Sequence, residues 1–355
     1  MSRCRRDAAA DVVVIGGGPA GCAAAITASR AGARVVLLER DLVARDRPGE
    51  TLHPGIEPLL TWLGAADLLP AATLARHEGH WVQSRGDRRF VAFGGDARGT
   101  WLGFQAWRQT LDGSLRRRAA ELGAEVRLGV AATGVLDDES GRVTGVVTDH
   151  GEGIRAPVVV DASGGVHWLA RKLPFGVTQL SPRYVATFGY VGPIDSFADR
   201  HSPPRDPELR MDRLGWTWIA PLGSRGWHWT RLSFAGRRTA PGWLPPVLRG
   251  RRSRGPSRGA DVTWRMARSV AGPGWLVAGD AGAVLDPASS HGVLRALLSG
   301  ARAGSVAAGA LGDSPAARGS FAAFDAWFRA GVYRDAAVLR ASYAAWARPD
   351  DRQKR

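Results

Sequence analysis

Residues 11–40, DVVVIGGGPAGCAAAITASRAGARVVLLER, read as a strand, a glycine-rich turn, a helix and a second strand. The apolar run DVVVI is typical of a strand buried on both faces. It leads directly into the pattern G-x-G-x-x-G, whose glycines are Gly16, Gly18 and Gly21. The first glycine permits a tight turn, the second lets the backbone approach a pyrophosphate, and the third lets the helix pack closely on the strand. The stretch therefore predicts a dinucleotide site.

The second strand of this unit, RVVLL, ends at Glu39, and Arg40 follows. A carboxylate at this position can accept hydrogen bonds from both hydroxyls of an adenosine ribose. This spacing of strand, turn, helix and terminal Glu favours a dinucleotide site over an ordinary glycine-rich turn. We expect an α/β chain in which the helix N-terminus faces the phosphates.

Length and cysteine content set limits on the protein class. A chain of 355 residues can bury a large core and form two domains. It contains no run of about 18 apolar residues, so we expect no membrane span. The cysteines, Cys4 and Cys22, provide neither a disulfide framework nor a metal-ligand spacing. We therefore expect a cytoplasmic protein without a bound metal.

The net charge of +15 comes almost entirely from arginine, since Lys172 and Lys354 are the only lysines. The arginines are spread along the chain, without a nucleic-acid motif or a basic amphipathic helix, so we expect a solvated basic surface and no nucleic-acid partner. The 14 tryptophans are more unusual, because large aromatic side chains supply apolar pocket walls.

A second pattern lies in residues 48–64, PGETLHPGIEPLLTWLG, where Gly-Glu-Thr-x-x-Pro precedes Leu-Leu-x-x-Leu-Gly. It resembles the flavin-dependent halogenases and their monooxygenase relatives, which share the fold of aromatic hydroxylases. The resemblance implies that the loop with Glu50, Thr51 and His53 lies against the isoalloxazine ring of FAD. Arg108, at a predicted helix start, resembles the family arginine that meets the FAD phosphates, although a solvated arginine remains the alternative.

Residues 158–171, VVVDASGGVHWLAR, extend the resemblance. A buried strand ending in Asp-x-x-Gly is similar to the second fingerprint of the family, which implies that Asp161 and Gly164 stand close to the dinucleotide phosphates. His167 occupies the usual serine position of this fingerprint, whereas Arg171 keeps the usual arginine.

Residues 275–293, WLVAGDAGAVLDPASSHGV, resemble the third fingerprint. Asp280 can accept a hydrogen bond from a ribityl hydroxyl, and a helix beginning near Gly292 points free N–H groups at the flavin N1/O2 edge. The order of the three fingerprints implies that the dinucleotide is FAD. The predicted cofactor-binding residues are Gly16, Gly18, Ala20, Gly21, Glu39, Arg40, Glu50, Thr51, Arg108, Asp161, Gly164, Asp280, Pro287, Gly292 and Val293.

The resemblance also implies a domain plan. We expect an FAD-binding Rossmann-like (GR2-type) domain in three pieces, residues 1–78, 103–174 and 262–312. An inserted antiparallel β-sheet substrate domain is expected from residues 79–102 and 175–261, and a pair of C-terminal helices from residues 313–355. Two stretches rich in Pro, Gly and Arg, 196–212 and 237–260, predict irregular loops.

The reaction depends on what surrounds the flavin. Trp216 and Trp218 belong to a Trp-x-Trp-x-x-Pro segment that resembles one in the halogenases, so they can wall the path to the substrate or belong to the core. A halogenase resemblance would imply a lysine in the first part of the substrate domain. Neither lysine fits that place, and arginine cannot replace it because it stays protonated.

We therefore expect an FAD-dependent monooxygenase that hydroxylates an aromatic group, indole- or phenol-like, free or peptide-borne, through a flavin C4a-hydroperoxide. His53, His291, Trp216 and Trp218 are the catalytic candidates, and Trp227 and Trp229 are expected to line the same dry pocket. Because no second glycine motif exists, electrons would come from transiently bound NAD(P)H or from a partner flavin reductase. The alternatives are a halogenase, a saturase-like reductase, and a maturation flavoprotein acting on a partner protein.

Overall fold

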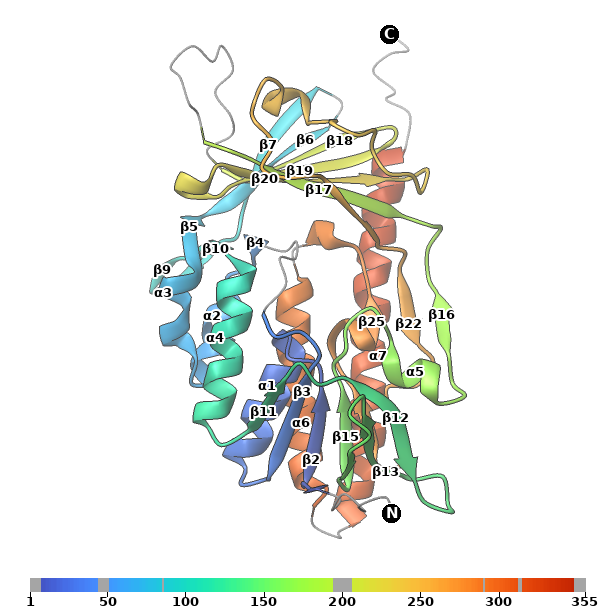
Figure 1. Ribbon diagram of the computed structural model, residues 1–355. Coiled ribbons are helices and arrows are strands. Elements are labelled where there is room, and N and C mark those ends of the chain that lie inside the picture. Colours follow the sequence, from blue (N-terminus) through green and yellow to red (C-terminus); the bar gives the residue numbers. More distant parts are fainter. Residues whose placement is uncertain are drawn as a thin grey trace.

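The computed structural model has a parallel sheet with helices in its lower half and an antiparallel sheet across the top (Figure 1). This is the α/β architecture with an added antiparallel sheet that the sequence predicts. The residues described by the structure are 8–43, 51–84, 86–193, 206–289, 291–311 and 315–347. None of the helices within these ranges is long and apolar enough to cross a membrane.

The lower half is built around a six-stranded sheet. Its strands, in spatial order, are β11 (Glu125–Leu128), β3 (Val35–Glu39), β2 (Val12–Ile15), β15 (Val158–Asp161), β24 (Trp275–Val277) and β23 (Ala271–Gly272). The first five are parallel and the last is antiparallel. Every residue of β2, β15 and β24 is buried, as their apolar sequences predict. The turns of the three fingerprints therefore leave the sheet along the same edge.

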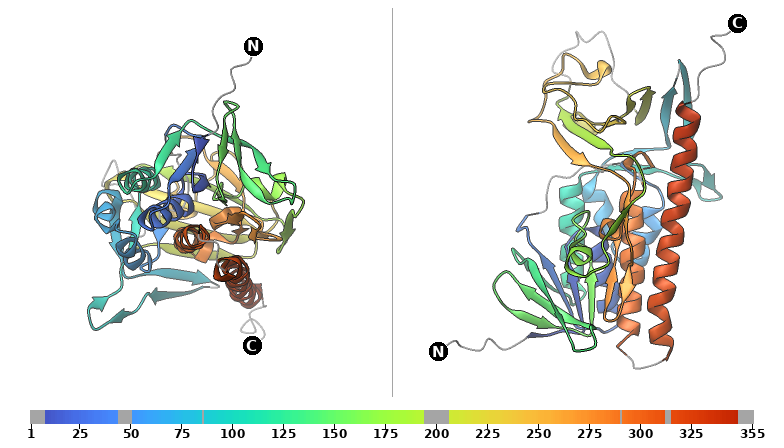
Figure 2. Two further views of the ribbon diagram at one scale, coloured as in Figure 1. Left: turned by 90° about the horizontal axis from the view of Figure 1, so that it is seen from below. Right: turned by 90° about the vertical axis from the view of Figure 1, so that its right-hand side faces the viewer.

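Helices cover one face of this sheet and a smaller sheet covers the other (Figure 2). The helices of the first face are α1 (Pro19–Arg30), α4 (Arg108–Glu121) and α6 (Gly292–Gly309). On the opposite face lie β1 (Ala8–Ala9), β14 (Gly153–Arg155), β13 (Val143–Thr148) and β12 (Ala132–Asp137). Helices α1 and α6 approach closely, because Gly300 and Gly304 of α6 face the backbone of Ala20 and Ala24 in α1.

The antiparallel half is a seven-stranded sheet. Its order is β21 (Arg258–Asp261), β17 (Val185–Val191), β20 (Trp227–Ser233), β19 (Gly215–Pro221), β18 (Glu208–Asp212), β6 (Gly79–Ser84) and β7 (Asp87–Ala92). All pairs are antiparallel except β18 with β6, where Trp81 pairs with Glu208 in parallel.

Two strands lie in stretches for which irregular structure was predicted, and both predictions are wrong at those positions. Within 196–212, residues 208–212 form β18 between β19 and β6, while 196–205 fall outside the described residues. Within 237–260, β21 begins at Arg258 and pairs with β17. In both cases a neighbouring strand supplies the hydrogen bonds that make the segment extended, so local composition did not reveal it.

Small elements join the two halves. One three-stranded sheet contains β4 (Thr51–Leu52), β10 (Gly103–Ala106) and β5 (Thr73–His77), and another contains β16 (Val177–Gln179), β22 (Arg265–Ala267) and β25 (Ala283–Val284). Strands β8 (Gly95–Asp96) and β9 (Gly99–Thr100) form a hairpin. The remaining short helices are α2 (Ile56–Trp62), α3 (Leu69–Ala72) and α5 (Trp168–Lys172).

The C-terminal segment is a single helix, α7 (Pro315–Ala347), rather than the predicted pair. Its buried positions recur every three or four residues, so one apolar stripe continues along the helix without a break that would end it. The stripe includes Phe324, Phe328, Val332, Ala336 and Leu339. Helix α7 runs beside the parallel-sheet half and reaches the antiparallel sheet (Figures 1 and 2). Near this end, Arg340 donates a hydrogen bond to the carbonyl oxygen of Leu180, between β16 and β17, at 2.9 Å.

Candidate functional site

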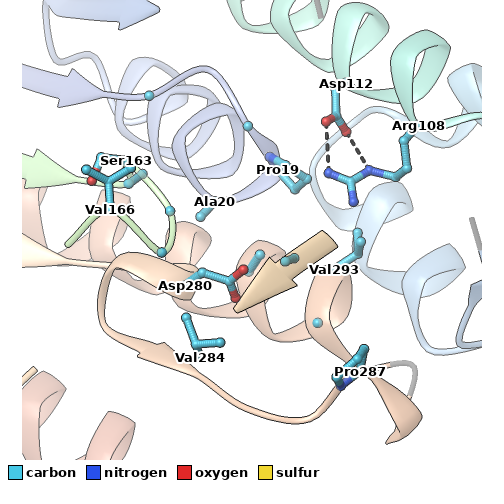
Figure 3. A pocket seen from close by; sticks show the side chains of 18 of the residues that line it. Pro19, Ala20, Arg108, Asp112, Ser163, Val166, Asp280, Val284, Pro287 and Val293 are labelled. Carbon is cyan, nitrogen blue, oxygen red and sulfur yellow. Dashed lines mark hydrogen bonds and ion pairs between the residues drawn. The ribbon is translucent and has the colours of Figure 1, made fainter. Parts of the chain in front are cut away.

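A cavity of about 510 Å³ lies between the turns that follow the parallel strands and one face of the seven-stranded sheet. Its lower side is lined by residues of all three fingerprints, including Gly16, Gly18, Gly164, Asp280, Pro287, Gly292 and Val293. Its sheet side is lined by Ala186, Phe188, Trp216, Trp218, His228 and Thr230. Figure 3 shows Asp280 between Ala20 and Val284 and Arg108 across from them. The cavity therefore joins the predicted dinucleotide site to the antiparallel sheet.

The glycine turn has the shape that a dinucleotide requires. Gly16 has a φ of +101°, and a Cβ on it would lie 2.5 Å from the carbonyl oxygen of Ala162. A Cβ on Gly21 would lie 1.8 Å from the carbonyl oxygen of Gly16. A Cβ on Gly18, by contrast, would meet nothing within 4 Å. The first and third glycines are thus required by the protein itself, whereas the second leaves a cradle for a pyrophosphate.

Glu39 is held at the end of β3 by backbone groups. Its Oε2 accepts a hydrogen bond from the amide of Gly17 at 2.8 Å, and its Oε1 accepts one from the amide of Asp41 at 3.0 Å. Both Glu39 and Arg40 line the cavity. The carboxylate is therefore fixed in orientation beside the glycine turn, and its contact with an adenosine ribose remains a prediction.

Two arginines reach the cavity from α4. Arg108 makes a bidentate pair with Asp112, with Nε–Oδ1 and Nη2–Oδ2 distances of 3.0 and 2.8 Å (Figure 3). Arg116, which the sequence reasoning missed, lies beside Gly17 and Glu39. Its buried Nε has no hydrogen-bond partner among the described residues, which fits a phosphate or ribose oxygen of the dinucleotide. The sequence did contain an indication of this role, because Arg108, Asp112 and Arg116 are spaced by four residues and therefore share one face of a helix.

Asp161 stands behind the second fingerprint rather than in the cavity lining. It is fully buried, and its carboxylate accepts hydrogen bonds from the amides of Ser163 at 2.9 Å and Leu169 at 2.7 Å. These contacts hold the loop that follows β15 and the first turn of α5. Gly164, in that loop, does line the cavity.

His167 links the second fingerprint to the third. Its Nδ1 lies 2.7 Å from the carbonyl oxygen of Ala281, and Nε of Arg265 lies 2.9 Å from its Nε2. Since a guanidinium only donates, Nε2 accepts and Nδ1 carries the proton. Burial and the nearby Arg265 lower the pKa of His167, which keeps this neutral form. A serine at this position would be too short to make both contacts.

The third fingerprint places a helix N-terminus at the cavity. Gly292 and Val293 begin α6 and line the cavity together with Asp280 and Pro287. The first amide groups of a helix have no partner within the helix, and the N-terminus carries partial positive charge. This end of α6 can therefore stabilise negative charge on a bound group.

The two histidines predicted to be catalytic lie together but do not line the cavity. The ring centroids of His53 and His291 are 4.8 Å apart, and Nδ1 of His53 accepts a hydrogen bond from the amide of Gly55 at 3.0 Å. Burial lowers the pKa of both, and their mutual repulsion adds to this for His53. Their catalytic role remains a prediction. Glu50 lies outside the described residues.

Trp216 and Trp218 both line the cavity, as their shared face of one strand predicts. Trp218 Nε1 donates to Thr51 Oγ1 at 3.0 Å, and Thr51 Oγ1 donates to Gln105 Oε1 at 3.0 Å. The side-chain nitrogen of Gln105 lies 3.1 Å from Nε2 of His77. This chain of buried hydrogen bonds fixes the indole of Trp218 relative to the loop that carries Thr51.

Trp227 and Trp229 do not line the cavity, so that prediction is wrong. Side chains alternate along β20, and Trp229 packs on the opposite face of the sheet with Ile219 and Leu248. The alternate positions, His228 and Thr230, face the cavity instead. The strand register explains which residues face the cavity. Paired residues of neighbouring strands share one face of the sheet, and Thr230 pairs with Trp218 and His228 with Ala220.

His80 packs beside Trp218, and its lowered pKa makes the stability of the protein depend on pH. Its ring centroid lies 5.5 Å from that of Trp218, and burial, with His77 and Arg89 adding, lowers its pKa to about 4. At a pH between the ordinary histidine value of about 6.5 and the lowered pKa of about 4, the imidazole of His80 is protonated in the unfolded chain but neutral in the native state. Stability is therefore lost as the pH falls through this window, by up to about 3 kcal/mol.

We expect a His80→Gln variant to escape this loss. Urea titrations of the wild type and the variant, from about pH 7.5 to about pH 4.5, should show the wild type losing about 2.5 kcal/mol more. His150→Gln, at an exposed turn, is the control and should follow the wild type. Parallel curves for the wild type and His80→Gln would contradict the assigned burial.

A glycine turn with open space at its second glycine, a carboxylate at the end of the next strand and a helix N-terminus, gathered at the carboxyl ends of parallel strands, are typical of an FAD-dependent oxidoreductase. Residues 9–194 match the family described as FAD binding domain, and the chain belongs to that family. It is also 32% identical over 308 residues to the menaquinone reductase of Mycolicibacterium smegmatis, covering 80% of this chain and 73% of that protein.

The chain is also similar in sequence to a halogenase and in fold to a brominase. The flavin-dependent halogenase armH3 of Armillaria mellea is 29% identical over 347 residues, covering 85% of this chain and 68% of that protein. The solved structure of the flavin-dependent brominase Bmp2 superposes with a TM-score of 0.82 at 23% identity, covering 94% of this chain and 86% of that one. This last likeness shows a shared fold.

Proposed function

We propose that the protein is an FAD-dependent monooxygenase that hydroxylates an indole- or phenol-like aromatic substrate. The observation that carries the proposal is the sheet side of the cavity, which is lined by the aromatic residues Phe188, Trp216 and Trp218 together with His228 and Thr230. Aromatic walls stack on aromatic substrates and exclude water, which a reactive oxygen-transfer step requires. The two polar side chains can hold an O–H or N–H group of the substrate.

The lysine content favours oxygen transfer over halide chemistry. Lys172 ends α5 and does not line the cavity, and Lys354 lies outside the described residues. In the first part of the predicted substrate domain, β6 carries His80 instead. A neutral imidazole or a permanently charged guanidinium does not offer the amine that a lysine would.

FAD supplies the redox chemistry when it is bound, and the protein's residues orient it and the substrate. His228 lies opposite Ala220 on the strand next to that of Trp218 and lines the same cavity, where its ring can accept a hydrogen bond from a substrate hydroxyl. Electrons would come from NAD(P)H bound transiently or from flavin reduced by a partner reductase.

A saturase-like reductase is the second candidate, and the identity with menaquinone reductase favours it. Such a reaction on an isoprenoid chain would call for a long apolar passage. The polar pair His228 and Thr230 in the cavity wall favours a compact aromatic substrate with a hydrogen-bonding group instead. An aromatic side chain within a peptide could make the same contacts with these residues.

The test is to supply the FAD-loaded protein with reduced flavin, oxygen and either chloride or bromide, together with indoles and phenols, free and within peptides. We expect a product heavier by one oxygen atom, in a yield that does not depend on halide. His228→Phe should lower turnover, whereas Trp229→Phe, on the opposite face of the same strand, should not. A halogenated product, or saturation of an isoprenoid quinone without oxygen, would overturn the proposal.

A further inference from the structure

The far end of α7 brings a tyrosine between the cavity wall and the third fingerprint. Nε1 of Trp216 donates a hydrogen bond to Oη of Tyr343 at 2.9 Å, and Oη of Tyr343 donates to Oδ2 of Asp286. The directions are settled, because an indole N–H can only donate. The phenol oxygen must therefore accept from Trp216, and its proton must point to the carboxylate.

Asp286 is the fixed point of this network. It is 3% exposed, lines the cavity and is followed by Pro287, which also lines it. Its Oδ1 accepts from the amide of Ala288 at 2.8 Å, and Nε1 of Trp264 lies 3.4 Å from its Oδ2. Burial raises the pKa of Asp286, while these donors and Tyr343 oppose the rise. A buried carboxylate keeps its place only while such donors satisfy it.

The ring of Tyr343 is held in turn by other aromatic rings. Its centroid lies 5.2 Å from that of Phe234, 5.6 Å from that of Trp264 and 5.0 Å from that of Trp346. Such a surrounding restricts the ring and so fixes the direction of its hydroxyl. The hydroxyl then connects β19, which carries Trp216, to the loop that precedes α6.

We propose that Tyr343 is a positioning residue of the FAD site, whose single hydroxyl sets both the Trp216 indole in the cavity wall and the Asp286–Pro287 turn on the cofactor side. In this proposal the C-terminal helix α7 contributes a side chain that orients residues lining the cavity, in addition to packing against the FAD-binding half. This holds whichever reaction the flavin performs, so it stands apart from the proposed function.

A double-mutant cycle tests the link. Tyr343→Phe keeps the ring and removes only the hydroxyl, and Asp286→Asn removes the charge that needs the donor. Tyr333→Phe is the matched control, since it makes the same change on an exposed part of the same helix. The readouts are the dissociation constant of FAD, from flavin fluorescence, and the visible absorption spectrum of the bound flavin. Far-UV circular dichroism checks that each variant is folded.

We expect Tyr343→Phe to raise the dissociation constant of FAD roughly tenfold, as loss of a hydrogen bond to a charged group would, and to shift the flavin bands. In the Asp286→Asn background the same change should matter less than about twofold, because coupled groups are not additive. Tyr333→Phe should match the wild type. An effect of Tyr343→Phe that persists undiminished beside Asp286→Asn, or that equals the control, would overturn the proposal. If Tyr343→Phe does not fold, an Asp286→Asn protein with unchanged FAD affinity and spectrum would overturn it equally.

Discussion

A Gly18→Val variant is expected to fold as stably as the wild type and to bind FAD about 100-fold more weakly or worse. The backbone at Gly18 has a φ of −81°, which a valine adopts without strain. A Cβ there meets no protein atom within 4 Å. The Cβ of the new side chain therefore meets no obstacle in the protein, while the side chain occupies the space in which a pyrophosphate would approach the backbone.

Gly192→Val is the control for this prediction, since a Cβ at Gly192 meets only the carbonyl oxygen of Arg252, at 3.8 Å, and Gly192 does not line the cavity. The measurements are FAD fluorescence titration and thermal unfolding of the FAD-free protein. FAD binding by Gly18→Val within about threefold of the wild type would mean that the cofactor does not pass this glycine.

A Gly300→Ala variant is expected to lose about 3 kcal/mol of stability, at the upper end of the effects of overpacking. The new Cβ would lie 2.0 Å from the carbonyl oxygen of Ala20 in α1. Because the obstacle is backbone, α1 must move as a whole, and α1 carries the glycine turn at its N-terminus. FAD affinity should therefore fall together with stability.

The same helix offers the control for this second prediction. Gly309 ends α6, and a Cβ on it would meet nothing within 4 Å. Gly309→Ala should be neutral or stabilising by up to about 1 kcal/mol, because alanine is the better helix former. Denaturant unfolding of the FAD-free proteins separates the two cases. Equal stabilities for Gly300→Ala and Gly309→Ala would show that α1 and α6 are not in close contact.

The dinucleotide half of the site was predictable because each of its parts depends on neighbours in the sequence. The runs that became β2, β15 and β24 are apolar throughout, and each leads directly into a glycine-containing turn. Since the three strands are parallel neighbours, their turns meet at one edge of the sheet. The positions of Gly18 and Asp280 in the cavity lining follow from that.

The substrate half was less predictable because its contacts join distant segments. Trp229 and His228 alternate on one strand, and only the pairing of β20 with β19 decides which of them faces the cavity. Tyr343 continues the spacing of the buried stripe on α7, at the interval after Leu339, so its inward direction could be inferred. Its partner Asp286 could not, because that depends on how far α7 extends beside the antiparallel sheet.

The parallel pairing of β18 with β6 also bears on how the chain reaches its native state. Trp81 of β6 is synthesised well before its partner Glu208 of β18. A long loop therefore has to close before this pair of strands can form. Non-local pairings of this kind slow folding and leave a strand edge open to other chains in the meantime. A fragment ending at residue 194 would lack β18 altogether and keep that edge unpaired. The early β6–β7 hairpin therefore depends on the later strand β18 to cover its open edge during folding, in addition to the place of β18 in the finished sheet.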